Sequence, residues 1–365
     1  MVTHVNPSYY SVMNHEIELK LRLNTRELPL LEKALASHQF ISEPTLQLLN
    51  RYFDTPNMAL SQGGAALRIR QQSIVDSTGN SVPPQIIQTL KTRGTSAGGL
   101  HQRMEWDWSL DKVELDLTVI QNSDAQDHLA SGIDLSRIEA LFTTDFQRKV
   151  WLYKDNDTVV ELVLDQGLVS TDEHRIDLLE LELELKAGDV EVLFQLAQDL
   201  AKQCPMLMSD ISKAERGYGL LARSEKFQSI KKDWQGKVPS FDPQQSIIST
   251  LKTFFAYQLS AWQRSLELSI WDGQAEQQDS GLRQITQLQN LLGLFSSIDC
   301  LPEAQLLQSQ LQQAKNAQWQ VSLIWGQVCI ACGHWLYSLE SDNTDLTMND
   351  EEQHAMQLHV RELAV

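Results

Sequence analysis

Cysteine and long apolar runs are both scarce in this chain. Its 365 residues include four cysteines, and only Cys329 and Cys332 lie close together, without a second pair to complete a zinc site. We therefore expect no disulfide framework and assign this pair to a core. No stretch approaches the roughly 18 apolar residues of a membrane span. Residues 1–14 lack the apolar segment of a signal peptide. These absences predict a cytoplasmic protein with no membrane partner.

Positive charge is also in deficit. The chain carries 30 Lys and Arg against 48 Asp and Glu, a formal net charge of −18. Such an excess of acid argues against a nucleic-acid partner unless the cations gather at one place. The hydrophobic fraction of 42% and the charged fraction of 21% are ordinary for globular proteins. At roughly 150 residues per domain, the length predicts two or three domains.

The first 220 residues alternate between apolar and polar side chains. Between residues 15 and 23, four apolar residues alternate with Glu16, Glu18, Lys20 and Arg22. This period of two predicts a strand with one buried face. The same pattern predicts strands at 66–70, 85–91, 103–110, 158–165 and 178–186. Helical spacing predicts helices over 26–37, with Thr25 as N-cap, and from 189 to 200. Antiparallel strands with local turns favour a barrel or a sandwich.

The pattern changes to a helical period after residue 245. Apolar residues at helical spacing predict helices over 246–270, 282–296, 302–318 and 319–339. Residues 246–365 carry five Lys and Arg against 13 Asp and Glu, a net charge of −8. The predicted organisation is an N-terminal extension (1–14), a strand-rich domain (15–222), a linker (223–245), a helical bundle (246–340) and an acidic, loosely ordered tail that could contain a last helix (341–365).

The charged faces of the predicted strands suggest phosphate chemistry. Glu180, Glu182 and Glu184 share one face, roughly 7 Å apart, and buried carboxylates so placed need cations among them. Mg²⁺ and Mn²⁺ favour such ligands. Arg68 and Arg70 likewise share a face, and a phosphate chain accepts adjacent guanidiniums. Solvated outer faces would carry similar charges. Acids and bases in one cavity would suit metal-assisted phosphoryl transfer.

Short motifs in a fixed order give these charges a family resemblance. Glu16-Ile-Glu-Leu-Lys20 resembles the ExExK signature of CYTH domains, the triphosphate tunnel metalloenzymes. The further motifs are Leu67-Arg-Ile-Arg70, Leu90-Lys91-Thr, Gly99-Leu-His-Gln-Arg-Met-Glu105, Thr144-Asp-Phe-Gln-Arg148, Val163-Leu-Asp165, the Glu180–Glu184 ladder and Ser212-Lys213-Ala-Glu-Arg-Gly217. The set is similar to bacterial inorganic triphosphatases, in which a helical CHAD-type region follows the CYTH domain. The resemblance implies an α+β fold: an eight-stranded antiparallel β tunnel with a charged lumen and flanking helices, followed by an all-α bundle.

The resemblance also implies roles for individual residues. The catalytic residues would be Lys20, Arg70 and Glu182. The phosphate chain would be bound by Lys20, Arg68, Arg70, Lys91, Arg103, Arg148 and Lys213. Mg²⁺ or Mn²⁺ would be held by Glu16, Glu18, Asp165, Glu182 and Glu184. A role for Glu180 stays open, because the family motif needs only two of the three glutamates of its strand.

The implied function is the metal-dependent hydrolysis of tripolyphosphate to pyrophosphate and phosphate by an activated water molecule. Hydrolysis or cyclisation of a nucleoside or thiamine triphosphate is an alternative, and so is non-catalytic binding of triphosphate or polyphosphate. CHAD regions resemble basic bundles that bind polyphosphate, whereas residues 246–365 are acidic. We therefore expect this region to be a structural bundle packed against the tunnel.

Overall fold

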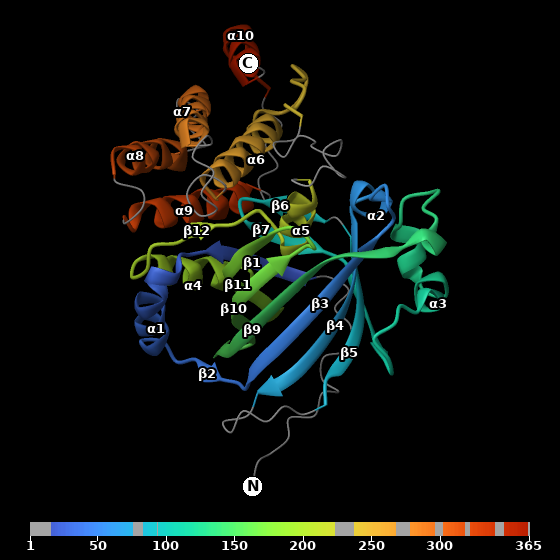
Figure 1. The fold of residues 1–365 in the computed structure, drawn as a ribbon. Helices are drawn as coiled ribbons and strands as arrows, with labels where there is room; N and C mark the ends of the chain where they lie inside the picture. Colours follow the sequence, from blue (N-terminus) through green and yellow to red (C-terminus); the bar gives the residue numbers. More distant parts are fainter. Residues whose placement is uncertain are drawn as a thin grey trace.

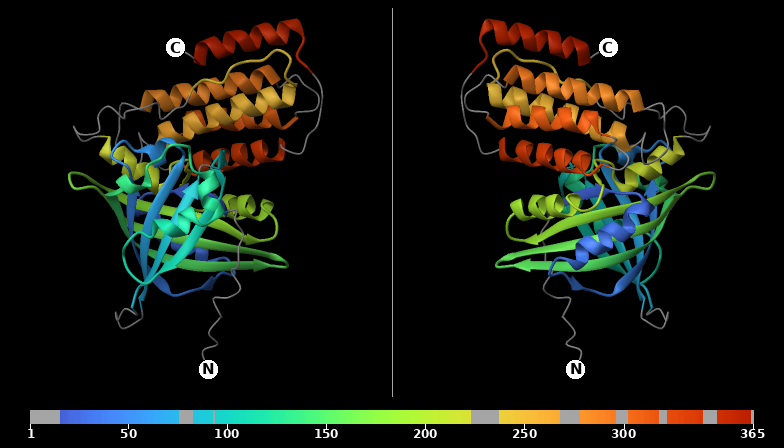
Figure 2. Two further views of the ribbon diagram at one scale, coloured as in Figure 1. Left: turned by 90° about the vertical axis from the view of Figure 1, so that its right-hand side faces the viewer. Right: turned by 90° about the vertical axis from the view of Figure 1, so that its left-hand side faces the viewer.

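The computed structural model has a curled β-sheet with helices stacked across one side of it (Figures 1 and 2). This arrangement confirms the expected α+β fold. Residues 1–14 and most of the 223–245 linker lie outside the described part of the chain. The structure describes residues 16–75, 83–92, 94–222, 237–267, 278–295, 302–317, 322–339 and 347–363.

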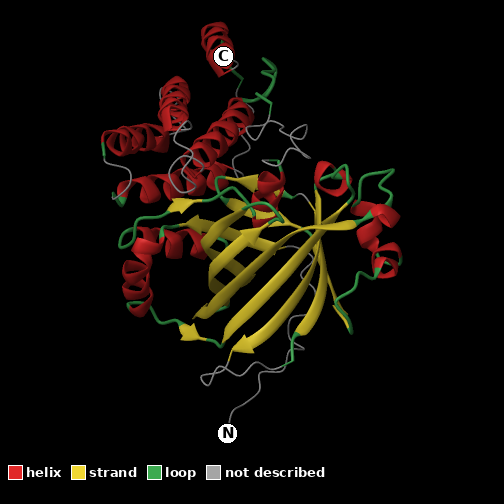
Figure 3. Ribbon diagram, in the orientation of Figure 1, coloured by secondary structure: helices red, strands yellow, loops and turns green. Residues whose placement is uncertain are grey.

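The sheet is antiparallel throughout its main path, and its twelve strands include two short ones at the side (Figure 3). The hydrogen-bonded order is β6-β7-β1-β11-β10-β9-β3-β4-β5-β8, with β12 on β1 and β2 on β9. The bounds are β1 Glu16–Arg22, β2 Ile41–Ser42, β3 Thr45–Asp54, β4 Ala65–Val75, β5 Gln85–Thr92, β6 Thr95–Ala97, β7 Leu100–Arg103, β8 Glu105–Leu110, β9 Glu139–Asp155, β10 Thr158–Ser170, β11 Arg175–Ala187 and β12 Leu207–Met208.

One segment of chain closes the sheet into a tunnel. β7 and β8 lie near opposite ends of the strand order, yet only Met104 separates them. In β7, Arg103 lies opposite Glu16 of β1, and in β8, Glu105 lies opposite Lys91 of β5. Taken as one strand, residues 100–110 complete a ring with β1, β11, β10, β9, β3, β4 and β5. This is the expected eight-stranded tunnel.

The predicted strands all form, and two long strands that the sequence pattern did not indicate, β3 and β9, complete the ring of eight. β9 places Phe146 and Arg148 on its inner side, so this side mixes apolar and charged residues. The alternation between apolar and polar side chains is therefore weak along this strand. β3 has the same mixed character. The assignment of Thr25 as the helix N-cap was wrong. Residues Thr25–Glu27 form a 3-10 turn, and α1 (Leu28–Ala36) begins after it with Pro29 in its first turn, where proline is tolerated.

The apolar side of the tunnel wall faces outward and packs against helices. Leu19 and Leu21 of β1 and Leu181 and Leu183 of β11 are fully buried. They belong to one hydrophobic core with α4 (Glu191–Ala201), α6 (Ile247–Leu266) and α9 (Ile324–Ser338). Since alternate residues of a strand point to opposite faces, this packing directs the charged side chains into the lumen.

The helical region contains α6, α7 (Gln278–Phe295), α8 (Pro302–Asn316), α9 and α10 (Asp350–Leu363). Figure 2 shows α9 next to the sheet and α10 farthest from it. The helix α10 lies within the predicted tail. Cys329 and Cys332 are in the core, where burial raises the pKa of Cys329 to about 11, so both are structural thiols. Among the described helices, none combines the length and apolarity needed to cross a bilayer.

A short helix, α5 (Lys213–Leu221), fills part of the lumen. Its Leu220 and Leu221 form a second apolar cluster with inward-facing residues of β3 and β9, including Phe142. Gly217 makes this packing possible, because a Cβ atom there would lie 2.1 Å from Cε2 of Phe142. The first residue of the helix, Lys213, faces the charged part of the lumen.

Candidate active site

The tunnel contains a cavity of about 1260 Å³ lined by charged residues from most of its strands. Of the predicted site residues, only Asp165 is absent from the lining. The predicted residues that line the cavity are Glu16, Glu18, Lys20, Arg68, Arg70, Lys91, Arg103, Arg148, Glu182, Glu184 and Lys213. The structure therefore brings together side chains that are spread over almost 200 residues of sequence.

Strand register brings the acids and bases of β1 and β11 together. Lys20 lies opposite Glu182, and Glu18 lies opposite Glu184. The Lys20 ammonium is 3.0 Å from Glu18 Oε1 and also forms an ion pair with Glu182. Burial alone would lower the pKa of Lys20, but Glu18 and Glu182 outweigh it and the pKa is raised. Lys20 is therefore a fixed positive charge.

A dense ionic group forms around Lys213. Its Nζ atom lies 2.7 Å from Asp165 Oδ2 and 3.0 Å from Glu182 Oε1, and it also pairs with Glu180. Arg148 donates two hydrogen bonds of 2.7 Å to Asp165. Burial opposes ionisation of Asp165, but Arg148 and Lys213 hold its pKa below its usual value. The glutamates of the ladder thus tolerate burial because cations lie among them.

Asp165, Glu180 and Glu182 bring carboxylate oxygens within 4.8 Å of one another, as a metal site would. Asp165 and Glu180 have no exposed surface, and in this arrangement the Lys213 ammonium pairs with all three acids. Their negative charge is therefore already compensated by protein groups. The role of Asp165 as a metal ligand stays a prediction, and so does the open role of Glu180.

An acidic wall with excess negative charge lies elsewhere in the cavity. Glu184 and Glu161 are opposite each other on β11 and β10. Lys186 is shared between them, at 2.6 Å and 3.2 Å respectively. Burial raises the pKa of Glu184 to about 7; Lys186 opposes the shift, whereas Glu16 and Glu161 add to it. This wall, defined by Glu16, Glu161 and Glu184, has more carboxylate than the local cations compensate.

A basic wall has the opposite imbalance. Burial, together with Arg68 and Arg148, lowers the pKa of Arg70 to about 10. Arg70 donates a hydrogen bond to the Asn50 side chain rather than to a carboxylate. Arg68 lies 3.5 Å from Glu105, at the limit of a hydrogen bond. In this wall, defined by Arg68, Arg70 and Arg148, the Arg70 guanidinium holds positive charge that an anion would stabilise.

The remaining predicted bases are already paired with acids. Lys91 lies 2.8 Å from Glu16 and 2.9 Å from Glu105. Arg103 donates to Glu16 at 2.8 Å and also pairs with Glu18. Burial favours the neutral form of Glu16, but Lys91 and Arg103 hold its pKa well below the usual value. These groups join the acidic wall to the rest of the lumen.

Sequence reasoning missed some cavity residues. Glu161 received no role, although it has the same parity as Asp165 on a predicted strand and so belongs to the same charged face. Lys186 follows the glutamate ladder with the same parity. Tyr52 and Arg264 also line the cavity. Tyr52 lies on a strand that was not predicted, and Arg264 comes from α6 of the helical region, so no local pattern indicated either residue.

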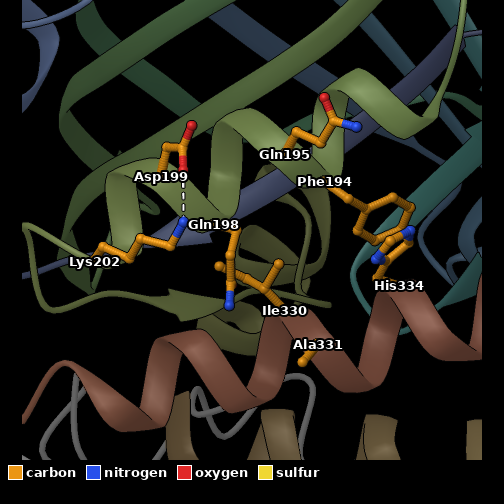
Figure 4. Close-up of a pocket in the computed structure, with 8 residues that line it drawn as sticks. All are labelled: Phe194, Gln195, Gln198, Asp199, Lys202, Ile330, Ala331 and His334. Atoms are coloured by element: carbon orange, nitrogen blue, oxygen red, sulfur yellow. Dashed lines mark hydrogen bonds and ion pairs between the residues drawn. The ribbon is translucent and has the colours of Figure 1, made fainter. Parts of the chain in front are cut away.

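A second cavity, of about 410 Å³, lies between α4 and α9 (Figure 4). Phe194 stacks on His334 with ring centroids 4.9 Å apart. Asp199 and Lys202 pair with each other along one helix at 2.8 Å. Since these charges are compensated locally, the tunnel rather than this cavity has the features of a reactive site.

The comparisons with known proteins agree with the geometry. A model of the CYTH domain family matches residues 14–218. The chain belongs to the CYTH family. It is 32% identical over 235 residues to an inorganic triphosphatase of Haemophilus influenzae, an alignment that covers 63% of this CYTH protein and 60% of that relative. The chain thus spans less than two thirds of the relative's length.

The solved structures that match this chain include two whose own chains are almost wholly covered. A putative adenylyl cyclase from Hippeastrum, described as having a dominant triphosphatase activity, is 21% identical with a TM-score of 0.40 over 60% of this chain and 98% of the other. A protein from Pyrococcus horikoshii is 16% identical with a TM-score of 0.38 over 57% of this chain and 99% of the other. The family assignment rests on the family model and not on these structures.

Proposed function

We propose that this CYTH protein hydrolyses inorganic tripolyphosphate to pyrophosphate and phosphate with the aid of Mg²⁺ or Mn²⁺. The observation that carries the proposal is the pair of opposite charge imbalances in one cavity. Glu184 on the acidic wall resists ionisation, with a pKa of about 7, and Arg70 on the basic wall has its pKa lowered to about 10. A divalent cation would relieve the first imbalance and a phosphate chain the second.

The acidic wall fits a divalent cation by its donor chemistry. Glu16, Glu161 and Glu184 offer carboxylate oxygens, which Mg²⁺ and Mn²⁺ prefer. Glu18 and Glu182, which also line the cavity, would be further metal ligands. Asp165, which does not line the cavity, stays in the proposed set of ligands. When bound, the cation would acidify a water molecule and neutralise charge on phosphate oxygens. It would also allow Glu184 to ionise at neutral pH.

The basic wall would bind and orient the phosphate chain. Guanidinium groups donate paired hydrogen bonds to phosphate oxygens, and Arg68, Arg70 and Arg148 all line the cavity. Arg148 is itself fixed by Asp165 and by Glu182 at 3.0 Å, so it is pre-organised before substrate enters. Lys91 and Arg103 would bind the end of the chain near the acidic wall. Such positioning lowers the barrier because no reorganisation is needed during reaction.

Lys20 and Lys213 would stabilise charge on the reacting phosphoryl group. Both ammonium groups contact Glu182, which is held ionised because Lys20, Lys213 and Arg148 outweigh the effect of its burial. Glu182 therefore links the groups that bind phosphate to the groups that would bind metal. Catalysis would consist of charge neutralisation and alignment, with water as the nucleophile and no covalent enzyme intermediate.

Phosphate release from tripolyphosphate, ATP and thiamine triphosphate tests the proposal. The full chain would be assayed with Mg²⁺, with Mn²⁺ and with chelator. We expect strong preference for tripolyphosphate and loss of activity in chelator. Faster turnover of ATP or thiamine triphosphate would replace the proposed substrate with an organic one. Tight binding without hydrolysis would identify a binding protein. A Glu173→Gln variant, altered at an exposed carboxylate, is the matched control for substitutions in the cavity.

A further inference from the structure

One face of α6 holds the segment of chain that carries Lys213. Ser260, Arg264 and Glu267 lie at helical spacing on this face. Arg264 donates from Nε to Asp210 Oδ2 at 3.1 Å and pairs with Glu215 at 2.5 Å. Arg264 also donates to the main-chain oxygen of Asp210 at 3.1 Å. The helical region therefore forms ion pairs and hydrogen bonds with residues on both sides of Lys213, Asp210 before it and Glu215 after it.

A buried ion pair is a further contact between α6 and this segment. Glu267, at the end of α6, pairs with Arg216 of α5, and both side chains are almost wholly buried. Ser209 donates a hydrogen bond of 2.8 Å to the same glutamate. Breaking a buried pair from one side leaves an uncompensated charge, so this contact favours a single docking position for α6 on α5.

Lys213 itself lies between these anchors. Ser212 caps α5 by accepting a hydrogen bond of 3.1 Å from the main-chain NH of Glu215. The ammonium of Lys213 then reaches Asp165, Glu180 and Glu182. Since residues on both sides of Lys213 are bonded to α6, the position of this ammonium depends on the helical region.

Arg264 also affects the charge of the cavity. Asp210 and Glu215 line the cavity together with Arg264. Burial tends to neutralise the guanidinium, but Glu215 and Asp210 raise its pKa, so it stays ionised. Its ion pairs compensate the negative charge of both carboxylates, which would otherwise repel an anion in the cavity. The side chain of Arg264 is 16% exposed, against 1% for Arg216, so its substitution is the milder probe.

We propose that Arg264 is a positioning residue of the tunnel site, through which α6 fixes Lys213 for reaction with a triphosphate. This inference rests on the proposed function and assigns the acidic helical region a part in it. The role requires no contact between Arg264 and substrate. It also explains why an arginine with two carboxylate partners lies at the junction between the helical region and the tunnel.

A double-mutant cycle tests the proposal, with tripolyphosphate hydrolysis in Mg²⁺ as the readout. We expect Arg264→Met to lower kcat about tenfold or more, because a misplacement on the order of 1 Å can cost about 100-fold. Lys213→Arg displaces the same cation while keeping its charge. In that background, Arg264→Met should change kcat less than about twofold, because the residues act through one group. Arg264→Lys, which retains a cation, should recover part of the lost activity.

Arg283→Met, at an exposed site on α7, is the matched control and should leave kcat unchanged. Melting temperatures identify variants that fail to fold. In that case Ser260→Ala replaces Arg264→Met, since it removes only a hydrogen bond to Asp210. Equal fold losses in the wild-type and Lys213→Arg backgrounds would overturn the inference. So would an Arg264→Met enzyme with normal kcat.

Failure of the proposed function would look different. If the wild-type chain binds tripolyphosphate without hydrolysing it, the same cycle is measured on the dissociation constant by calorimetry. Independent losses would then overturn the positioning role. If the wild-type chain neither binds nor hydrolyses any triphosphate, both proposals are wrong. An active wild-type enzyme with independent effects of the two residues would overturn the inference alone.

Discussion

Arg70 donates a hydrogen bond from Nε to Oδ1 of Asn50 at 2.9 Å, and within the described residues no carboxylate forms an ion pair with its guanidinium. The contrast with Arg148, which holds Asp165 through two nitrogens, shows two kinds of arginine in one cavity. The charge of Arg148 is compensated by acids of the protein itself. Arg70 keeps an uncompensated charge, and such a group is suited to a ligand rather than to the fold.

Replacing Arg70 with methionine should therefore separate activity from stability. We expect kcat/KM for tripolyphosphate to fall by about 10²–10³, the range for losing one preorganised donor. The free energy of unfolding without substrate should rise, by an amount on the order of 1 kcal/mol, because a half-buried like charge next to Arg68 and Arg148 is removed. Chemical denaturation and steady-state kinetics measure the two effects. A folded variant with near-normal turnover would argue against the basic wall as a phosphate site.

Replacing Glu184 with glutamine should weaken metal binding. The carboxylate has a raised pKa of about 7 because of burial and the nearby Glu16 and Glu161. Removing this charge should lower Mg²⁺ affinity about tenfold or more, judged from the effects of perturbing metal ligands and their partners. Calorimetric titration with Mg²⁺ gives the affinity.

The stability of the same variant gives an independent check. In chelator at pH 8, the Glu184→Gln protein should melt at a higher temperature than the wild type, because a carboxylate whose ionisation is opposed by burial and by Glu16 and Glu161 is absent. Added Mg²⁺ should stabilise the wild type more than the variant. Glu173→Gln should behave as the wild type in both measurements. Equal stabilisation of all three proteins by Mg²⁺ would place the metal elsewhere.

Replacing Gly217 with alanine should displace α5. The new methyl group would meet the Phe142 ring at 2.1 Å, and overpacking of this kind costs about 1–3 kcal/mol. We expect a lower melting temperature and a lower kcat, because Lys213 lies on the same helix. Adding Phe142→Leu to the alanine variant should recover part of both losses by making room. A double variant with no recovery would mean that the ring is not the obstacle.

The stability of the helical region should depend on pH through His359. Burial lowers the pKa of this histidine, although Glu362 favours its charged form, and Nε2 lies 2.8 Å from the Gln258 amide nitrogen. A depressed pKa means that the unfolded chain binds the proton more tightly. The stabilisation is therefore complete above about pH 6.5 and is lost as the pH falls through the folded-state value.

Thermal melting between pH 8 and pH 5 measures this effect. The wild type should lose stability across the acidic part of the range. His359→Gln should lose less, because the titrating group is gone. His354→Gln provides the control, since it alters an exposed histidine on the same helix. The same pH profile in wild type and His359→Gln would exclude this residue as the cause.

Much of the wall of the tunnel could be predicted from alternation alone. Parity shows that Glu182 and Lys20 face the same side as their neighbours, and the apolar residues between them show which side is packed. Parity does not show which strands are adjacent. The pairing of Glu161 with Glu184 depends on the register of β10 and β11. The register was therefore needed to find the acidic wall.

No local sequence pattern indicated that α6 contacts the tunnel site. Arg264 is one arginine in a largely apolar helix, and its partners Asp210 and Glu215 lie 54 and 49 residues earlier. Nothing within a few residues of either site indicates the other. Such a contact follows from how the helical region docks, which depends on the whole of the shared core.

Met104, the single residue between β7 and β8, determines which side of the tunnel wall each side chain of β8 faces. Arg103 and Glu105 both point inward because Met104 alone separates them, while Trp106 packs outside the wall. Since side chains alternate, inserting one residue at Met104 would turn Glu105 outward and Trp106 inward. Lys91 would lose a carboxylate and gain an indole. An insertion of two residues would keep the ionic interior, whereas a single inserted residue would exchange it for an aromatic one unless a β-bulge absorbed it, as the register shifts elsewhere in this sheet do.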